Sequence, residues 1–498
     1  MALDSFHSLV HLDLKGAPPK LEYLEKVFPL LTKWGATGLL VEYEDMFPYH
    51  SELSSLRSQS AYSSNEINTL VRLASQNGLI VIPLVQSFGH LEFVLKHTEY
   101  KTLREMADSP MALCPSKPGE DKFLTDSLRN TEGQSNLFHE KSLKIVCSMI
   151  DQVIAAHPGI QWFHIGCDEV YHLGICEQCR KRMTEESLTP HELFFQHVKN
   201  VAFHVRNHHQ GVIPIIWDDM FRFAEVSILA VSGLGELVVP MVWHYLASFN
   251  LPPDLWQKLS SIFSSVWVAS AFKGATGPRA CATNINYHLE NHLNWIAALN
   301  EMKCLFKNIH GIAITGWQRY DHYAVLCELL PHGLPSLAMC LQTIRKGLTS
   351  EVHETVTADL GFTSLLPLNP FGCGEIPTCS FPGSSVYQLM IEFVYLEAEC
   401  RKFICNDGCL TWMNDYNVRR NFTNPVHIKP ILSTAGVMLA QLEEFQKKLS
   451  TALQDIFYPN TVEEWQGTYL APLMADVQKL VDAGRQQLSL FQGGAVLP

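Results

Sequence analysis

Residues 163–170 read FHIGCDEV, an apolar run that passes Gly166 and reaches two adjacent acids, Asp168 and Glu169. Short apolar runs bounded by glycine are typical of buried parallel strands. A strand that ends in two carboxylates places them where barrel enzymes carry their active sites. The alternative is a helix N-terminus whose acids complement the helix dipole. The rest of the chain favours the strand.

Eight short apolar runs alternate with amphipathic stretches from residue 8 to about residue 345, a pattern typical of βα units and a parallel sheet. Eight strands favour a closed (β/α)₈ TIM barrel over an open sheet. The expected strands are Ser8–Leu14, Gly38–Glu44, Leu79–Gln86, Gln161–Cys167, Val212–Trp217, Val238–Trp243, Val266–Ala271 and Gly311–Thr315, and the clearest helices are Leu21–Trp34, Ser64–Gln76 and Ser142–His157. The long connection from Leu91 to His139 contains Pro110, Pro115, Pro118 and Gly119, so we expect an irregular excursion over one face.

The pattern changes after about residue 348. Strand signals give way to long stretches with helical spacing, which predict a catalytic barrel over residues 1–347 and an α-helical C-terminal region over residues 348–498. We expect helices over Val386–Phe403 and Ile431–Ile456, the second opened by Pro430, and a capping box formed by Thr461 and Glu464. The apolar stripes of these helices are expected to pack on the barrel or on a second subunit, so a homodimer is possible.

Composition limits the class of protein. The 498 residues are 47% apolar and 17% charged, as in a globular protein. The 37 basic and 50 acidic residues give a net charge of −13, which argues against a nucleic acid partner. No apolar run is long enough to cross a bilayer, and the first residues lack the features of a signal peptide. We therefore expect no membrane partner and a location in the cytoplasm, the nucleus or both.

Cysteine usage points to reduced thiols, because many of the 14 cysteines lie within apolar segments. Cys176 and Cys179 form a C-x-x-C pair, which could be half of a zinc site or a redox pair. A structural zinc site usually needs a second pair of ligands at similar spacing, and none follows clearly. We therefore expect no metal and, in the absence of a glycine-rich phosphate-binding turn, no cofactor.

Polar and aromatic residues follow the expected strands, and in a barrel these positions meet at one face. Three tryptophans among them lie near several carboxylates, a combination that suits a pyranose ring: indole faces pack on its C–H surface while acids bind its hydroxyls. The strand-end residues are Asp13, Lys15, Glu42, Glu44, Asp45, Gln86, His90, Asp168, Glu169, Trp217, Asp218, Asp219, Trp243, Tyr245, Lys273, Trp317, Arg319, Tyr320, Asp321 and His322.

HIGCDEV resembles the H-x-G-G-D-E signature of family 20 β-N-acetylhexosaminidases, with Cys167 in place of the second Gly. The resemblance extends in order through HLDLKGAPPK, EYEDMFPY, PLVQSFGH, WDDM, ASAFKGATGP and TGWQRYDHY, and covers residues 8 to about 345 densely. It implies an exo-enzyme that removes terminal, non-reducing β-GalNAc or β-GlcNAc from glycoconjugates, with retention of configuration. The attacking group is then the 2-acetamido oxygen of the substrate, which forms an oxazolinium intermediate.

The resemblance also implies roles for individual residues. Glu169 would be the general acid and then the base, and Asp168 would bind the acetamido N–H and stabilise the oxazolinium. We expect a neighbouring ionised Asp168 and partial burial to raise the pKa of Glu169. Because successive strand residues face opposite ways, the chain must leave strand geometry at this pair. The predicted substrate-binding residues are Asp13, His90, Trp217, Asp219, Trp243, Tyr245, Trp317, Arg319 and Asp321.

The chain also departs from the family pattern. The family commonly binds the outer hydroxyls with an Arg after the first strand and a Glu two residues past the last-strand Trp, where this chain has Asp13/Lys15 and Arg319. This exchange leaves the choice between GalNAc and GlcNAc open. Three alternatives also remain open: a silent sugar-binding protein on the same barrel, a zinc hydrolase using Cys176, Cys179 and His172, and an endo-acting enzyme.

Overall fold

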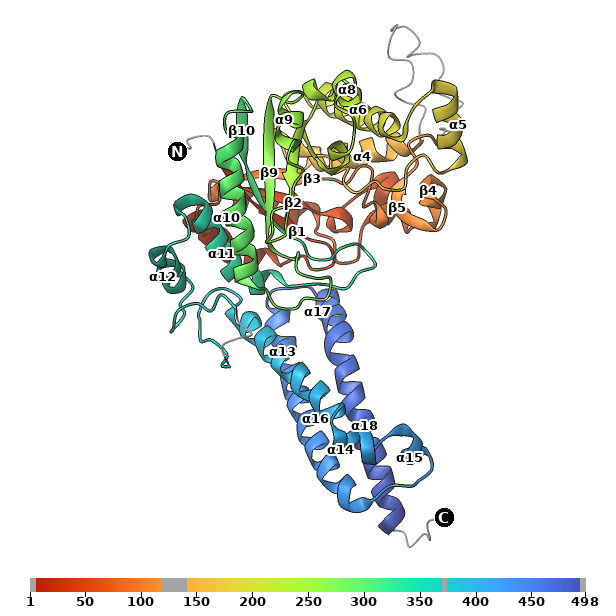
Figure 1. Cartoon of the computed structure of the whole chain (residues 1–498), viewed down its shortest axis with the longest axis vertical. Coiled ribbons are helices and arrows are strands. Elements are labelled where there is room, and N and C mark those ends of the chain that lie inside the picture. The colour runs from red at the N-terminus through yellow and green to blue at the C-terminus, as the bar shows by residue number, and fades with distance from the viewer. Residues whose placement is uncertain (1–5, 118–140, 370–373, 493–498) are drawn as a thin grey trace.

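The computed structural model describes residues 6–117, 141–369 and 374–492. It confirms the predicted barrel: eight parallel strands close into a ring in the order β1-β2-β3-β6-β7-β8-β9-β10, and β10 pairs with β1 (Figure 1). The barrel strands are β1 (His7–Asp13), β2 (Gly38–Glu42), β3 (Ile80–Leu84), β6 (Trp162–His164), β7 (Ile213–Trp217), β8 (Val239–Trp243), β9 (Ser265–Lys273) and β10 (Asn308–Gly316).

Helices in the connections surround the strands and alternate with them along the chain (Figure 1). Two of the three predicted helices have the expected bounds, and the third is shifted by one or two residues. The connecting α-helices are α1 (Leu21–Trp34), α2 (Ser64–Gln76), α4 (Lys141–Ala155), α5 (Glu177–Glu186), α6 (Pro190–His208), α7 (Asp219–Arg222), α8 (Val226–Val231), α9 (Leu255–Ser260), α10 (Ile285–Met302), α11 (Leu330–Lys346) and α12 (Ser350–Asp359). Short 3₁₀ helices occur at Glu44–Met46, Ser51–Leu56 and Leu234–Glu236.

The alternation of side chains along each strand builds two apolar layers. Leu9 packs inside the barrel with Leu40, Met241 and Trp267, whereas Val10 packs outward against the helices. The same period of two that turns Leu9 inward also turns polar side chains toward the barrel interior near the carboxyl ends of the strands. The fold therefore gathers strand-end residues from distant parts of the sequence at one face.

The strand that leads to the acidic pair is shorter than predicted. β6 ends at His164, and the backbone then adopts positive φ at Gly166, Cys167 and Glu169. The predicted departure from strand geometry is thus confirmed, and it begins three residues earlier than the expected end at Cys167. A Cβ on Gly166 would lie 1.9 Å from Gln86 Oε1, so this close approach requires glycine.

The connection after β3 contains ordered elements rather than only irregular chain. It forms α3 (Glu92–Leu95), a 3₁₀ helix (Thr98–Leu103) and an antiparallel hairpin of β4 (Arg104–Met106) and β5 (Ser109–Leu113). Pro110 lies in β5, whereas Pro118, Gly119 and His139 lie outside the described residues.

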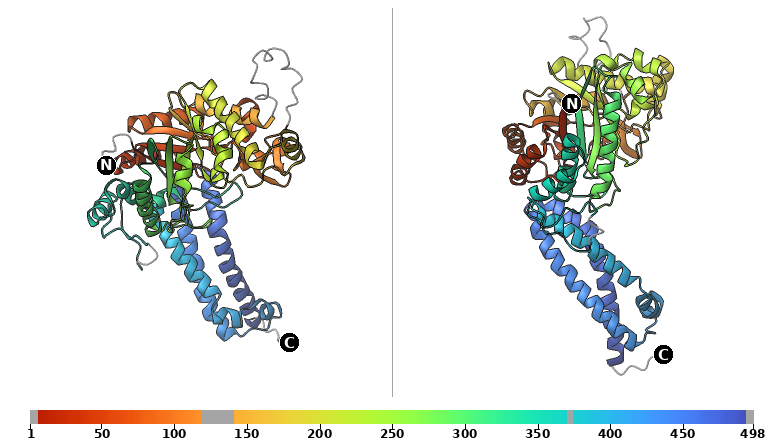
Figure 2. Two further views of the ribbon diagram at one scale, coloured as in Figure 1. Left: turned by 45° about the horizontal axis from the view of Figure 1, so that its top comes forward. Right: turned by 60° about the vertical axis from the view of Figure 1, so that its left-hand side comes forward.

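The C-terminal region is helical, as predicted. Its three longest helices, α13 (Ser384–Ile404), α16 (Pro425–Gln454) and α18 (Ala471–Gln492), project together from the barrel (Figures 1 and 2). The short helices α14 (Asp407–Trp412) and α15 (Asp415–Arg419) lie near the far end of this projection, and α17 (Pro459–Trp465) with a π-helical turn (Gln466–Leu470) lies near the barrel (Figure 1). The division at residues 347/348 stays a prediction.

Two details predicted for this region are wrong. Pro430 lies inside α16, which begins at Pro425 because Asn424 Oδ1 caps it by accepting the Val426 N–H. Thr461 and Glu464 form no capping box, because the Thr461 hydroxyl donates to Gly16 O at 2.8 Å. Glu464 instead pairs with Arg319 of the barrel. Both side chains make contacts between distant segments, which a local pattern does not reveal.

The base of the extension packs on the loops that follow the barrel strands. Besides these two contacts, Lys20 N–H donates to Ile456 O at 2.7 Å, and the Tyr469 hydroxyl donates to Leu326 O. One continuous cluster of buried side chains includes residues of both the barrel and the extension. None of the described helices combines the length and apolar character needed to cross a membrane.

Candidate active site

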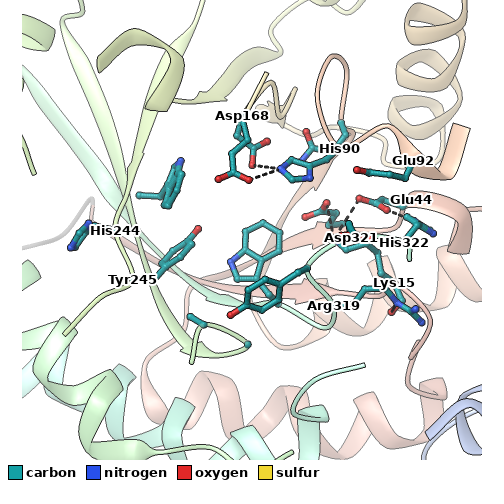
Figure 3. A pocket seen from close by; sticks show the side chains of 18 of the residues that line it. Lys15, Glu44, His90, Glu92, Asp168, His244, Tyr245, Arg319, Asp321 and His322 are labelled. Atoms are coloured by element: carbon teal, nitrogen blue, oxygen red, sulfur yellow. Dashed lines mark hydrogen bonds and ion pairs between the residues drawn. The ribbon is translucent and has the colours of Figure 1, made fainter. Parts of the chain in front are cut away.

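A cavity of about 410 Å³ opens at the carboxyl ends of the strands (Figure 3). Eight of the eleven predicted site residues line it, namely His90, Asp168, Glu169, Trp243, Tyr245, Trp317, Arg319 and Asp321. Asp13, Trp217 and Asp219 are not part of its wall. The cavity therefore collects residues from the loops after β1, β2, β3, β6, β8, β9 and β10.

The acidic pair lies on one side of the cavity, and His90 joins its two members. His90 Nε2 lies 3.5 Å from Asp168 Oδ2 and 3.2 Å from Glu169 Oε2. Asp168 is buried, and its Oδ1 has no hydrogen-bond partner within the described part of the chain. Glu169 is more accessible, with 34% of its side chain exposed, and its Oε1 accepts the Tyr171 hydroxyl at 3.2 Å. The two acids thus have different environments.

The pKa of Glu169 is lowered, and the expected upward shift is wrong. The main cause is its hydrogen bond to His90, which outweighs partial burial. Although burial opposes it, the charge of Asp168 and the contact with Glu169 raise the pKa of His90 to about 10. Burial raises the pKa of Asp168, while His90 opposes that shift. The sequence predicts His90 as a site residue, but the contact of its Nε2 with both carboxylates appears only in the structure.

Asp219 lies behind the acidic pair and holds it in place. Its Oδ2 accepts the backbone N–H of Glu169 at 2.9 Å, and its Oδ1 accepts the indole N–H of Trp243 at 3.1 Å. Burial, together with the charges of Asp168 and Asp218, raises the pKa of Asp219 to about 7. This residue connects the acidic loop to the aromatic wall.

Aromatic rings form the opposite wall. Trp243 and Tyr245 stack with ring centroids 5.1 Å apart, and Tyr245 meets Trp317 edge to face at 6.3 Å. Trp217 is fully buried beneath them in the barrel core and contacts Trp317 at a centroid distance of 6.2 Å. Two of the three predicted tryptophans therefore face the cavity, and the third supports them.

A charged cluster forms the third side of the cavity (Figure 3). Lys15 Nζ lies 3.2 Å from Glu42 Oε1, 3.4 Å from Glu44 Oε1 and 3.2 Å from Asp13 Oδ2. His322 also pairs with Glu44. Burial raises the pKa of Glu44 well above its usual range. The Asp13 carboxylate already has partners within the protein, since its Oδ2 also accepts the Gln318 N–H at 2.7 Å.

Arg319 lies at the edge of this cluster and is held by both parts of the molecule. It donates to Lys15 O at 3.3 Å, to Ala324 O at 3.0 Å and to Glu464 Oε2 at 2.8 Å. Gly16 makes room for it, because a Cβ there would lie 1.7 Å from Arg319 Nη2. Asp321 accepts the Tyr323 and Ala324 N–H groups through Oδ1 and shapes the same loop.

Several cavity residues were not among the predicted site residues. Glu92 is the clearest example of a missed residue, because it lies on α3 and not at the end of a strand. Its position two residues after His90 is the one signal that could have found it. Burial raises the pKa of its carboxyl. The others are Lys15, Glu42, Glu44, Gln86, His244, Leu246, Gly274, Ala275, Tyr320 and His322, of which most follow strands directly.

Comparisons with known proteins agree with this arrangement. Residues 21–258 match the model of the glycosyl hydrolase family 20 catalytic domain. The chain is 42% identical to Hexosaminidase D of Homo sapiens over 482 residues, covering 95% of this chain and 93% of that protein. It is 46% identical to Hexosaminidase D of Bos taurus over 361 residues, covering 72% and 97% respectively.

A solved structure shows the same fold at low sequence identity. The β-N-acetylhexosaminidase from Bacteroides fragilis NCTC 9343 superposes with a TM-score of 0.51 and 16% identity, covering 71% of this chain and 70% of that chain. Extensive identity to the human and bovine relatives, together with the matching catalytic-domain model, establishes that this chain belongs to glycosyl hydrolase family 20 and is a glycoside hydrolase.

Proposed function

We propose that the protein is an exo-β-N-acetylhexosaminidase that removes terminal, non-reducing β-GalNAc or β-GlcNAc from glycoconjugates. The observation that carries this proposal is the buried Asp168 Oδ1, an acceptor without a protein partner among the described residues, beside the more accessible Glu169. An unpartnered buried acceptor is costly, and the N–H of a substrate acetamido group would satisfy it. The names of the relatives support a hexosaminidase.

The proposed reaction is substrate-assisted and retaining. The acetamido carbonyl oxygen attacks C1, the bond from C1 to the leaving oxygen breaks, and Glu169 gives its proton to that oxygen. Asp168 accepts the acetamido N–H and stabilises the positive oxazolinium. Water then attacks C1 and passes a proton to Glu169, so the sugar leaves with its original configuration. Tyr245 is the proposed partner of the acetamido carbonyl.

In this proposal, His90 controls the protonation state of Glu169. In the free protein the hydrogen bond from His90 lowers the pKa of Glu169 and keeps it ionised. A bound sugar would cover the exposed third of Glu169 and remove water from it. Desolvation favours the neutral acid, so we expect the shared proton to move from His90 to Glu169 when the site is filled.

The size of the cavity supports an exo mode. A volume of about 410 Å³ lies at the small end of ligand pockets and suits one sugar ring. Trp243 and Trp317 would pack on that ring, while Lys15, Glu44, Glu92, Arg319 and Asp321 are the proposed partners of its outer hydroxyls. Asp219, Asp13 and Trp217 would act by positioning these groups.

The test is hydrolysis of matched aryl β-GlcNAc, β-GalNAc, β-glucoside and β-galactoside substrates, with and without an oxazoline mimic of the thiazoline type. We expect turnover of the two acetamido sugars only, and inhibition by the mimic. Equal turnover of the 2-hydroxy sugars would contradict the substrate-assisted mechanism. Binding of the mimic without any turnover would identify a silent sugar-binding protein.

We also propose that the protein works in a reducing compartment, the cytoplasm or nucleus, and forms a homodimer. None of the cysteines among the described residues forms a disulfide, which supports the first point. Exposed Leu410, Tyr416, Phe422 and Val426 near the far end of the extension support the second. Microscopy of the tagged protein tests the location, and sedimentation that gives only the 56.2 kDa chain mass at all concentrations would contradict the dimer.

A further inference from the structure

The C-x-x-C pair meets two further ligand-type side chains outside the cavity. Cys114 follows β5 and Glu105 lies in β4, while Cys176 caps α5 and Cys179 lies in its first turn. Cys114 Sγ is 3.3 Å from Cys176 Sγ and 3.4 Å from Cys179 Sγ, and Cys179 Sγ is 3.1 Å from Glu105 Oε2. One ligand atom from each residue lies within 4.8 Å of every other.

This cluster is buried and preorganised. Cys114, Cys179 and Glu105 are each at most 3% exposed. Glu105 Oε1 accepts the N–H groups of Ile175 and Cys176 at 2.6 and 2.9 Å, which leaves Oε2 to face the sulfurs. The backbone N–H of Cys179 points at Cys176 Sγ at 3.3 Å, a contact that stabilises a thiolate.

Although Glu105 Oε1 is hydrogen-bonded, its Oε2 faces the sulfurs, and a cation among these donor atoms would pair with the buried charge of the carboxylate. Three sulfurs and one carboxylate oxygen are a donor set suited to tetrahedral Zn²⁺. A disulfide would join only two of the three sulfurs and would leave the third unused. An iron–sulfur cluster normally takes four cysteines, and the described part of this cluster offers three.

We propose that Cys114, Cys176, Cys179 and Glu105 bind a structural Zn²⁺. The three thiols release their protons to solvent as three Zn–S bonds form, and Glu105 Oε2 completes the tetrahedron. All four ligands come from protein side chains, so no position is left for substrate, as in structural sites. None of the four residues lines the sugar cavity.

The site ties two distant segments together. The β4–β5 hairpin and α5 lie next to each other at one end of the barrel (Figure 1). The chain runs from Glu169 to Cys176 in seven residues, so a metal at Cys176 anchors the far end of the loop that carries the acidic pair. Zinc would therefore stabilise this loop without taking part in hydrolysis.

The test measures metal content and does not depend on the proposed reaction. The intact protein is expressed in zinc-supplemented medium, purified without chelators and analysed by mass spectrometry for metals. We expect about one zinc per chain in the wild type and in the control Cys147→Ser, a half-buried cysteine on α4 outside the cluster. Cys114→Ser and Cys176→Ser are each expected to retain less than about a tenth of that zinc.

A second measurement covers the case in which the serine variants do not fold. Mercurial titration of the wild type should release one zinc as three thiols react, and cobalt in place of zinc should give sulfur-to-cobalt charge-transfer absorption. Zinc-free wild type with freely reactive thiols would overturn the proposal. Peptide mapping that shows a disulfide from Cys114 to Cys176 or Cys179 would also overturn it, in favour of a redox pair.

Discussion

At the scale of single residues, His90 decides how the two acids differ. It contacts both carboxylates, and it lowers the pKa of Glu169 while burial raises that of Asp168. The two acids are adjacent in the sequence, yet Asp168 is buried with a free acceptor and the Glu169 side chain is one-third exposed. Their proposed roles therefore follow from environment rather than from residue type.

We expect Glu169→Gln to slow hydrolysis of substrates with poor leaving groups by at least ~100-fold, because general acid catalysis contributes about that much. Activated aryl glycosides need little protonation and should lose less than ~10-fold. Asp168→Asn is the isosteric comparison, and it should slow both substrate types by ~100-fold, since in the proposed reaction acetamido attack on C1 displaces any leaving group in the same step and Asp168 stabilises the charge that develops. Steady-state kinetics on both substrate types checks this, and equal loss in Glu169→Gln would contradict the assigned acid.

The pH profile tests His90. The proposed reaction needs protonated Glu169 and ionised Asp168, so its rate should fall when pH rises through the pKa of Glu169 and when pH falls through the pKa of Asp168. Replacing His90 with Gln removes the cation that holds both pKa values down, and burial then raises each of them. We expect both limbs of the kcat/KM profile to move to higher pH, by ~1 unit.

The control for this prediction is His208→Gln, an exposed histidine on α6. Its profile should match the wild type. An unchanged or more acidic optimum in His90→Gln would show that His90 does not set the two pKa values.

At the scale of elements, the loop after β6 is built around left-handed backbone. Gly166 and Cys167 have φ of 65° and 70°, and the family signature has glycine at both positions. Cys167 adopts this conformation at a fully buried position, where its Sγ contacts Ser87 Oγ at 3.0 Å. The strain of this loop is the cost of presenting two successive acids to one cavity.

Gly166→Ala tests the close approach in this loop. Gly159→Ala is the matched control, because Gly159 has φ of 79° and nothing lies within 4 Å of its Cβ position. Both variants carry the left-handed penalty of about 1 kcal/mol, but only Gly166→Ala forces Gln86 and the backbone apart. We expect Gly166→Ala to lower the free energy of unfolding by at least ~2 kcal/mol more than the control, as measured by chemical denaturation. Equal effects would mean that Gln86 moves freely.

At the scale of the whole molecule, the helical extension reaches the cavity through Glu464. Its carboxylate pairs with Arg319, which lines the cavity. The extension thus packs on the face of the barrel that carries the proposed chemistry, and not on a remote side.

Glu464→Gln should raise KM roughly threefold to tenfold, equivalent to about 1 kcal/mol, because Arg319 loses a charge-assisted hydrogen bond and its position. We expect kcat to change less than ~2-fold, since Arg319 lies away from the acidic pair. Glu463→Gln, an exposed neighbour on the same helix, is the control and should leave both constants unchanged. A change in kcat alone would contradict a role in sugar binding.

Local patterns in the sequence determined much of this protein. Apolar runs that alternate with amphipathic stretches predict all eight barrel strands, because the apolar character of a run indicates that the run itself is buried. The strand-end positions of His90, Asp168, Glu169, Trp243, Tyr245, Trp317, Arg319 and Asp321 then follow, since parallel strands end at one face. The bounds of α1 and α2 also follow from local periodicity.

Only the tertiary structure decided the features that depend on contacts between distant residues. It brings Glu92 to the cavity, joins Glu464 to Arg319, and unites Cys114 and Glu105 with the C-x-x-C pair. It also reverses the expected shift of the Glu169 pKa, because His90 is 79 positions away in the chain but 3.2 Å away in space. Hydrophobic periodicity and the burial that it indicates are local properties, which can be read from neighbouring residues in the sequence. Electrostatic partners depend on which distant residues the fold brings together.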